Sequence, residues 1–321
     1  MILKAEKPYD VLLLGAGNID IVVSGCNAIP DAGQEIRVPN ISFHIGGGTA
    51  LSGLGMAKLG MRPIITGIVG DDYCGRFIID ELNRNGVATD IVFSQQQNTG
   101  ISIAFNPETD RSFVTYDGTV TEFTLNDVQE QLFATVRHVH ITGYNGRSNH
   151  EEYLFFVTKA KQAGLTVSMD VGWDETGEWY EGIFDIIPSV DVFFANELEA
   201  LHYSRKSDVK DALSVFANCT PSAVIKLGEG GVIAEREGKM MHHPSFQVTV
   251  VDTTGAGDSF NAGYLYGYLK GDDLEHCLKY GTACGSLSVT KRGGSTGSPT
   301  LAELTAFLSD HSPREAVTLL S

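Results

Sequence analysis

The residues best suited to chemistry lie in one stretch, Asp-Thr-Thr-Gly-Ala-Gly-Asp-Ser-Phe at 252–260. The apolar run 246–251 before it predicts a buried strand, and apolar residues at helical spacing predict a helix from about 258 to 269. The glycines of Gly255-Ala256-Gly257 let the backbone approach a bound group, and the unpaired N–H groups at a helix start attract anions. Asp258 could accept a proton from a hydroxyl there. The stretch predicts an anion site beside a base, although glycines in such turns also serve purely steric needs.

The overall composition excludes several classes of protein. The chain has 321 residues, enough for one large α/β domain or two medium ones, and a formal net charge of -17. We expect no nonspecific binding of nucleic acid or of an acidic membrane by so negative a protein. Five scattered cysteines show neither CxxC nor zinc spacing, which indicates reduced thiols in a cytoplasmic protein. The sequence contains no signal-like N-terminal region and no apolar run long enough to span a membrane.

Alternating strands and helices are expected to position the site. The run 9–15 predicts a buried first strand, and strands and helices alternate from Thr124 onward. Such alternation predicts a mainly parallel sheet with helices on both faces. The later strands are expected at 138–142, 166–169, 192–195, 223–227 and 232–234, with helices such as 150–163 and 210–217 between them. The segments 20–45, 87–93 and 99–116 have strand patterns and are expected to form a smaller projecting sheet.

Two common nucleotide-binding motifs are missing from the sequence. The segment Gly15-Ala16-Gly17-Asn18-Ile19-Asp20 begins like the dinucleotide-binding GxGxxG motif, but Asp20 replaces the third glycine and no helical pattern follows. No GxxxxGK[ST] sequence occurs either. The sequence therefore disfavours a dehydrogenase and a P-loop NTPase.

The full stretch from Asp252 to Gly263 closely resembles the C-terminal signature of the ribokinase-like (PfkB) carbohydrate kinases. The resemblance covers nearly the whole chain. It implies a three-layer α/β/α ribokinase-like fold with a mainly parallel central sheet and a small β lid over the substrate site. The implied nucleotide-binding core comprises residues 1–19, 46–91 and 121–321, and the implied lid comprises residues 20–45 and 92–120.

The resemblance also implies roles for single residues around the acceptor and the transferred group. Asp258 would be the catalytic base, and the amides of the preceding residues would hold the phosphoryl group. These residues are Gly255, Ala256 and Gly257. Substrate hydroxyls would be bound by Asn18, Asp20, Gly47 and Gly48. Leu51 stands where the family's N-terminal signature has an asparagine that binds a substrate hydroxyl. The substrate is therefore expected either to present less polar surface there or to be held differently.

Further residues resemble the family's nucleotide and metal sites. Asn196 and Glu199 match an Asn-x-x-Glu motif that organises Mg²⁺ and its waters beside the triphosphate. Contacts to ATP are implied for Asn196, Lys226, Gly228, Gly231, Thr254 and Thr282, although Lys226 could also be a plain surface lysine. A monovalent cation, K⁺, would be bound by Asp252 and Thr254 with the carbonyls of Ser288, Lys291 and Gly293. Gly297 provides no side-chain hydroxyl where the family often has one.

One departure concerns the substrate. Relatives commonly carry Asp-x-Asn-x-Arg where this chain has Asp170-Val171-Gly172-Trp173-Asp174, so Asp170 agrees and the last two positions differ. Because of these differences, the sequence does not indicate which sugar is bound.

These features predict an ATP- and Mg²⁺-dependent kinase that phosphorylates a hydroxyl of a small sugar or sugar-like molecule. Two alternatives remain open: a nucleoside kinase of the same family, and a non-catalytic ligand sensor on the same fold. The expected partners are the small-molecule substrate and ATP, without nucleic acid or membrane, and the lid could form a homodimer contact.

Overall fold

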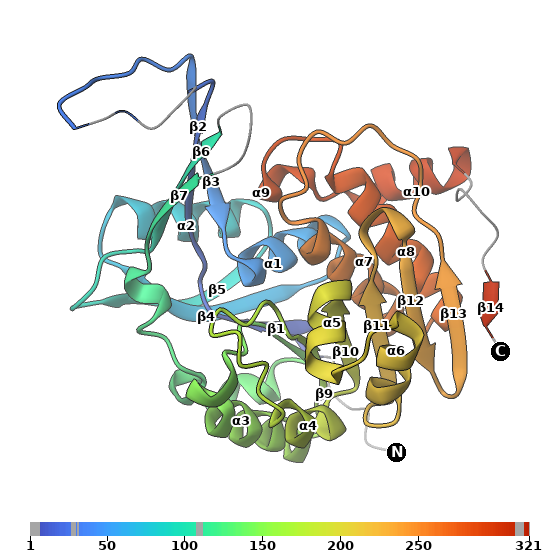
Figure 1. Ribbon diagram of the computed structural model, residues 1–321. Coiled ribbons are helices and arrows are strands. Elements are labelled where there is room, and N and C mark those ends of the chain that lie inside the picture. Colours follow the sequence, from blue (N-terminus) through green and yellow to red (C-terminus); the bar gives the residue numbers. More distant parts are fainter. Residues whose placement is uncertain (1–6, 27–29, 31, 107–111, 312–317, 321) are drawn as a thin grey trace.

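The computed structural model describes residues 7–26, 30, 32–106, 112–311 and 318–320. The strands of a large sheet in this part of the chain are β1 (Val11–Leu14), β4 (Pro63–Gly70), β5 (Ala88–Ser94), β8 (His138–Ile141), β9 (Thr166–Asp170), β10 (Val192–Asn196), β11 (Ser222–Lys226), β12 (Val232–Arg236), β13 (Lys239–His243) and β14 (Thr318–Leu320). Their order is β14-β13-β12-β11-β10-β9-β8-β1-β4-β5 (Figure 1). Neighbours from β11 to β5 are parallel, and the remaining strands join antiparallel at one edge.

Helices cover both faces of this sheet. One face carries α1 (Gly48–Lys58), α2 (Tyr73–Arg84), α7 (Ala256–Lys270), α8 (Leu274–Ser288) and α10 (Leu301–Asp310), and the other carries α3 (His150–Gln162), α4 (Ile183–Ile186), α5 (Glu197–Ser204) and α6 (Val209–Ala217). Successive residues of β1 point to opposite faces, so Leu12 packs in one core and Leu13 in the other. Both are fully buried. The predicted three-layer α/β/α architecture is confirmed.

A second, four-stranded sheet projects from the large one (Figure 1). It comprises β3 (Asn40–Gly46), β2 (Asn18–Ser24), β6 (Ile101–Asn106) and β7 (Ser112–Tyr116), in that order. Side chains alternate between its faces, so the paired residues Asp20, His44, Ser102 and Thr115 form a polar row on one face. The next row, on the opposite face, is apolar and consists of Ile21, Phe43, Ile103 and Val114. The polar face carries the substrate residue predicted at position 20.

Two strand predictions differ from the structure. The run 246–251 is not a strand: residues 244–255 connect β13 to α7 as a loop, and Val250 and Val251 are about half exposed. The amides of Val251 and Asp252 donate to the carbonyl of Val289 instead of to a neighbouring strand. The strand predicted at 87–93 exists as β5, but it pairs with β4 in the large sheet and not with the small one.

The helix predicted at the chemical stretch is confirmed as α7, which runs beside α1 and α8. None of the helices in the described ranges is long and apolar enough to cross a membrane.

Candidate active site

Two predicted carboxylates meet at the three-glycine turn that joins β3 to α1. A Cβ atom built on Gly46 would lie 2.3 Å from Oδ1 of Asp20, and one built on Gly48 would lie 2.9 Å from Oδ1 of Asp258. A side chain at either position would collide with a carboxylate, and Gly47 between them has a φ of 88°. The turn therefore requires glycine and separates Asp20 from Asp258 by only the width of its backbone.

The Asp20 carboxylate is held by its neighbour on β2. Asn18 Nδ2 donates to Asp20 Oδ1 over 2.8 Å, so the two residues predicted to bind substrate act together. Burial raises the pKa of Asp20, and the hydrogen bond from Asn18 partly offsets that rise. The pair presents a half-buried acceptor and an amide beside the turn.

Asp258 lies in the first turn of α7. Gly255 precedes this helix with a left-handed φ of 73°, and the Ser259 amide donates to its carbonyl over 2.9 Å. Burial, and then the negative charge of Asp170, raise the pKa of Asp258 to about 7. A general base is most effective when its pKa lies near the working pH, so this carboxyl group is suited to remove a proton from a hydroxyl.

Ser52 is a site residue that the sequence analysis missed. Its hydroxyl, fully buried in α1, donates to Asp258 Oδ1 over 3.3 Å. A serine among the buried apolar residues of α1 was the available signal, because buried polar groups need a hydrogen-bond partner.

Lys226 lies at the carboxyl end of β11, against α7. Its Nζ is 2.6 Å from Asp170 Oδ2 at the end of β9. A Cβ built on Gly257 would lie 3.3 Å from the same Nζ. Asn261 Nδ2 donates to the same Asp170 oxygen over 2.6 Å. Burial alone would lower the pKa of Lys226, but the Asp170 carboxylate outweighs it and the pKa is raised. The alternative of a surface lysine is therefore wrong.

Asn196 and Glu199 form a reciprocal cap at the start of α5. The Asn196 amide donates to Glu199 Oε2 over 2.8 Å, and the Glu199 amide donates to Asn196 Oδ1 over 2.9 Å. Glu199 is buried, and burial together with the charge of Asp170 raises its pKa. The cap gives both residues a structural role that is independent of a metal.

The charges around Lys226 do not balance. The carboxyl groups of Asp170, Glu199 and Asp258 all influence this one ammonium group. The described residues contain no group of three or more His, Cys, Asp or Glu side chains close enough to bind a metal directly. An excess of carboxyl groups without a complete set of protein ligands fits Mg²⁺, which usually keeps several of its waters.

The residues predicted to bind a monovalent cation lie together. Asp252 Oδ1 accepts from the amide and hydroxyl of Thr254, and Asp252 Oδ2 accepts from the Gly293 amide over 3.0 Å. The Ser288 carbonyl accepts from the Lys291 amide over 3.4 Å. A Cβ built on Gly297 would lie 2.7 Å from that carbonyl, so Gly297 packs where a hydroxyl ligand was expected.

The remaining predicted nucleotide contacts have different surroundings. Gly228 has a φ of 57° and faces open space, whereas a Cβ on Gly231 would lie 2.2 Å from the His243 carbonyl of β13. Gly231 is therefore required by strand packing. The hydroxyl of Thr282 is buried and has no hydrogen-bond partner within the described part of the chain.

Leu51 does not perform the substrate-binding role of the family's asparagine. It is buried, and Cβ atoms built on Gly255 and Gly294 would lie 3.1 Å and 2.8 Å from its Cδ1. Leu51 packs against the turn before α7, so the polar contacts to a substrate must come from other residues.

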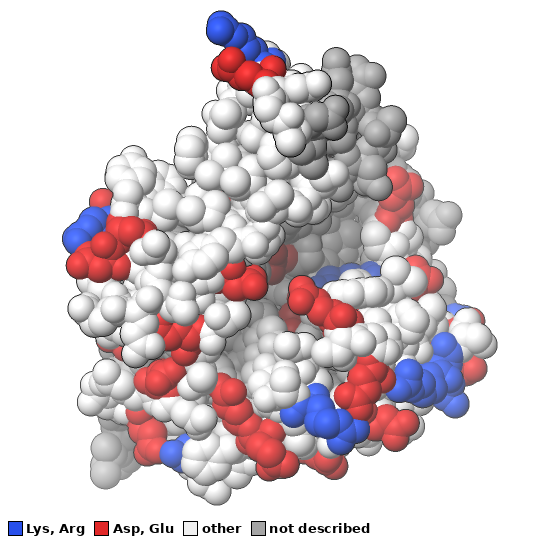
Figure 2. All heavy atoms as spheres, turned by 60° about the vertical axis from the view of Figure 1, so that its left-hand side comes forward, with Lys and Arg blue, Asp and Glu red and all other residues white. Residues whose placement is uncertain are grey.

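A cavity of about 630 Å³ opens beside the glycine turn. Asn18, Gly47 and Gly48 line it, together with the ends of β1 and β8 and the loop at 173–175. Figure 2 shows a hollow below the small sheet, with several acidic side chains near it. Because it is lined by predicted substrate residues next to Asp258, this cavity is the candidate acceptor site.

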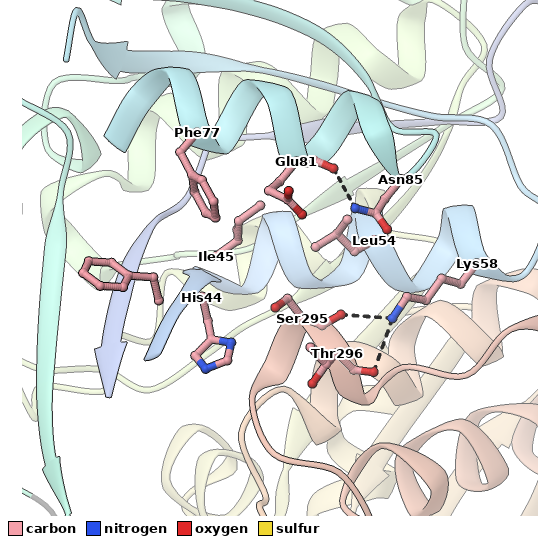
Figure 3. Close-up of a pocket in the computed structure, with 10 residues that line it drawn as sticks. His44, Ile45, Leu54, Lys58, Phe77, Glu81, Asn85, Ser295 and Thr296 are labelled. Carbon is pink, nitrogen blue, oxygen red and sulfur yellow. Dashed lines mark hydrogen bonds between the residues drawn. The ribbon is translucent and has the colours of Figure 1, made fainter. Parts of the chain in front are cut away.

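A smaller cavity of about 340 Å³ lies between β3, α1, α2 and α9 (Gly294–Gly297) (Figure 3). Its lining includes Phe77, Glu81 and Lys58, and none of the predicted catalytic residues. We do not assign the acceptor to it.

Comparisons with known proteins agree with this geometry. The model of the pfkB family of carbohydrate kinases matches residues 10–301. The 5-dehydro-2-deoxygluconokinases of Geobacillus thermodenitrificans and Bacillus subtilis are 29% and 27% identical to this chain, covering 94% and 93% of it and 94% and 95% of their own lengths. A crystal structure of a putative ribokinase II from E. coli in complex with ATP and Mg²⁺ is 25% identical, with a TM-score of 0.80, over 94% of this chain and all of the other.

A solved Arabidopsis thaliana ribokinase superposes with a TM-score of 0.82 at 23% identity, over 94% of this chain and 98% of the other, which shows the shared fold. The fold is thus ribokinase-like, as predicted. The chain belongs to the PfkB family of carbohydrate kinases and is a sugar kinase.

Proposed function

We propose that this kinase transfers the terminal phosphoryl group of ATP to a hydroxyl of a small sugar in the 630 Å³ cavity. The observation that carries the proposal is the pair Asp20 and Asp258, which flank the 46–48 turn next to the start of α7. The E. coli relative solved with ATP and Mg²⁺ supports the choice of both for this chain. The free cysteines agree with a reducing, ATP-containing compartment such as the cytoplasm.

In the proposed mechanism, Asn18 and Asp20 bind acceptor hydroxyls and Asp258 accepts the proton of the hydroxyl that attacks. The amides of Gly255, Ala256 and Gly257 would donate to the phosphoryl oxygens, since the first amides of a helix lack intrahelical partners. The Ala256 amide, which donates to the Thr253 carbonyl over 3.2 Å, would share or exchange that bond. Phosphoryl transfer needs mainly positioning and charge stabilisation, which fixed amides provide without reorganisation.

We assign the nucleotide side of the site to the cluster at the ends of β9, β10 and β11. Lys226, whose Nζ lies 3.3 Å from a Cβ built on Gly257, would neutralise phosphate charge. Asn196 and Glu199 would hold Mg²⁺ through waters, and the metal would offset charge on the phosphates. We also assign Gly228 and Thr254 to the phosphates. Thr282, whose buried hydroxyl has no hydrogen-bond partner among the described residues, is assigned to the adenine of ATP.

A panel of sugars, sugar acids and nucleosides with ATP and Mg²⁺ tests the function, with ADP and the phosphorylated product measured by chromatography. We expect phosphorylation of at least one sugar. Turnover of nucleosides alone would favour a nucleoside kinase, and binding without any turnover would favour a sensor. The two relatives described above, both named 5-dehydro-2-deoxygluconokinase, favour neither alternative.

We propose that K⁺ stimulates the enzyme only weakly, because an ammonium group already holds the segment beside the cation residues. Lys58 Nζ donates to the carbonyls of Ser295 and Ser298 over 3.0 and 3.1 Å. We expect replacement of K⁺ by a bulky organic cation to change kcat less than about threefold, under ~0.7 kcal/mol. In the Lys58→Met variant, replacing K⁺ by the bulky organic cation should lower kcat by much more than about threefold. ADP is measured without coupling enzymes, and strong K⁺ activation of the unaltered protein would contradict the proposal.

We propose that the small sheet is a lid, and that its apolar face pairs with the same face of a second copy. Ile41, Phe43 and Val114 on this face are 51%, 58% and 55% exposed. Contiguous exposed apolar side chains of this kind mark interaction surfaces. Sedimentation at micromolar concentration should show a dimer, and the paired change Phe43→Asp and Val114→Asp should give a folded monomer. A monomeric unaltered protein would contradict this proposal.

A further inference from the structure

The charged side chains among the described residues that line the acceptor cavity all have the same sign. Its charged lining residues are Asp117, Glu152 and Glu175. Of the described residues that line it, none is a lysine or an arginine. Asp20 and Asp258 add two further carboxyl groups beside the glycine turn. A negatively charged acceptor would therefore meet no counter-charge among the described residues that line the cavity. Lys226, the cation close enough to influence Asp258, is already paired with Asp170 over 2.6 Å.

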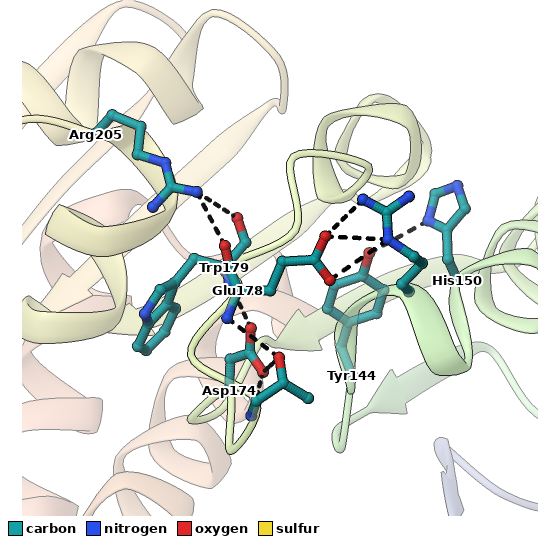
Figure 4. A network of polar contacts seen from close by, with 8 residues as sticks. Tyr144, His150, Asp174, Glu178, Trp179 and Arg205 are labelled. Carbon is teal, nitrogen blue, oxygen red and sulfur yellow. Dashed lines mark hydrogen bonds and ion pairs between the residues drawn. The ribbon is translucent and has the colours of Figure 1, made fainter.

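The nearest arginine candidate is occupied elsewhere. Arg147 lies between Asn145 and Asn149, which both line the cavity. Its guanidinium donates to Glu178 from Nε over 3.0 Å and from Nη2 over 2.5 Å, and it stacks 4.1 Å above the ring of Tyr180. Figure 4 shows Glu178 within the polar network of the 174–179 loop. The Arg147 and Glu178 side chains are 66% and 43% exposed, so this pair occupies the guanidinium group at the surface and is not a buried clamp.

The loop at 173–175, which forms one wall of the cavity, carries the carboxylate of Asp174. Asp174 is buried and accepts from the Thr176 hydroxyl and from the Trp179 amide, each over 2.6 Å. These hydrogen bonds outweigh burial and lower its pKa, so the group stays ionised. Arg205, the other arginine of this network, donates to the carbonyls of Glu178 and Trp179 over 3.0 and 3.1 Å (Figure 4). Both arginines serve to hold the loop.

The uncharged polar groups of the lining suit hydroxyls. Asn18, Asn145 and Asn149 provide amides, and Thr49 and Thr142 provide hydroxyls that lie 3.0 Å from each other. Amide and hydroxyl groups both donate and accept, as sugar hydroxyls do. A neutral polyhydroxy compound can therefore be bound without a buried counter-charge.

We infer that the acceptor is an uncharged sugar and that sugars bearing a carboxylate are rejected, an inference that rests on the proposed kinase function. Like charges brought close together in a cavity of low effective dielectric constant repel each other. Placing unpaired like charges against a wrong ligand is an effective source of specificity. On this point the chain would differ from the relatives named as kinases of a gluconate derivative.

The test compares matched pairs of acceptors that share a carbon skeleton: D-ribose with D-ribonate, and 2-deoxy-D-glucose with 5-dehydro-2-deoxy-D-gluconate. We expect kcat/KM to be at least about 100-fold higher for a neutral member that is phosphorylated than for its acid. Preference for an acid would overturn the inference while leaving the kinase function intact. Failure of every sugar, acid and nucleoside would instead count against the proposed function itself.

A charge reversal at the cavity sharpens the test. Glu175→Lys places a cation in the lining and should narrow the ratio of neutral to acid kcat/KM by about tenfold or more. Glu181→Lys makes the same change in net charge outside the lining, and should leave the ratio nearly unchanged. An equal effect of both changes would show that total charge decides, and would contradict a role for the cavity.

Discussion

Replacing Asp258 by asparagine should lower kcat about 10³-fold, because asparagine cannot accept the proton of the attacking hydroxyl and general-base catalysis contributes 10²–10⁴-fold. The change keeps the shape and the Ser52 contact of the side chain. ATP should still bind, since the amides of the 255–257 turn are unaltered. Single-turnover kinetics and nucleotide-binding calorimetry measure the two effects separately. A variant that retains a third of the normal kcat would refute the assignment.

The pH dependence of the unaltered enzyme provides an independent check. Because the pKa of Asp258 is raised to about 7, kcat/KM should fall about tenfold for each pH unit below that value as the base is protonated. Asp258→Asn should lack this limb. An unaltered protein with flat activity between pH 5 and 8 would contradict the assignment.

As the pH rises toward 7, the contribution of Asp258 to the free energy of unfolding should fall while kcat/KM increases. A carboxyl group whose pKa is raised from 3.8 to about 7 on folding favours the folded state only when protonated, so this contribution is complete below pH ~4 and is lost as the pH rises to 7. Asp258→Asn removes an unfavourable buried charge, so its Tm at pH 8 should equal or exceed that of the unaltered protein. Thermal melts at pH 5 and pH 8 measure this, and a lower Tm at pH 8 would indicate that the loss of activity reflects damage to the fold.

Replacing Lys226 by methionine should have the largest effect on stability. The ammonium group is 15% exposed and 2.6 Å from Asp170, so its removal leaves that carboxylate without its counter-charge. Breaking a buried pair in this way costs about 3–5 kcal/mol. Lys226 also lowers the pKa of Asp258, so the acid limb of the pH profile should move to higher pH. Urea unfolding and the pH dependence of kcat/KM measure the two effects.

Two matched variants serve as controls for the effect of Lys226→Met on stability. Lys159→Met breaks a pair with the exposed Glu130 and should cost less than about 1 kcal/mol. Lys226→Met combined with Asp170→Asn removes both members of the 2.6 Å pair, so it should recover part of the lost stability, although Glu199 and Asp258 still lack the ammonium group. If Lys226→Met destabilised no more than Lys159→Met, the ion pair would not have the buried character described above.

The sequence alone predicted most of the elements and supplied the candidate residues of the proposed site. Helix α7, the parallel strands and the family followed from local patterns, namely apolar periodicity and the stretch 252–263. The error at 246–251 arose because a short apolar run fits a strand and a partly buried loop equally well. The segment at 87–93 was correctly predicted as a strand, but a period of two does not identify the sheet in which a strand pairs.

The tertiary structure decided which groups surround the base. Ser52 lies 206 residues from Asp258 in the sequence, and Lys226 lies 56 residues from Asp170, so no local pattern could reveal these contacts. The surroundings of two other residues also depend on which helices and strands pack together. Leu51 packs against the turn before α7, and Asp174 accepts hydrogen bonds within its own loop. Local preferences are set by neighbours a few residues away, whereas burial and charge are set by the whole fold. The sequence therefore determined the kind of chemistry, and only the folded chain determined the pKa of its base and the charge of its cavity.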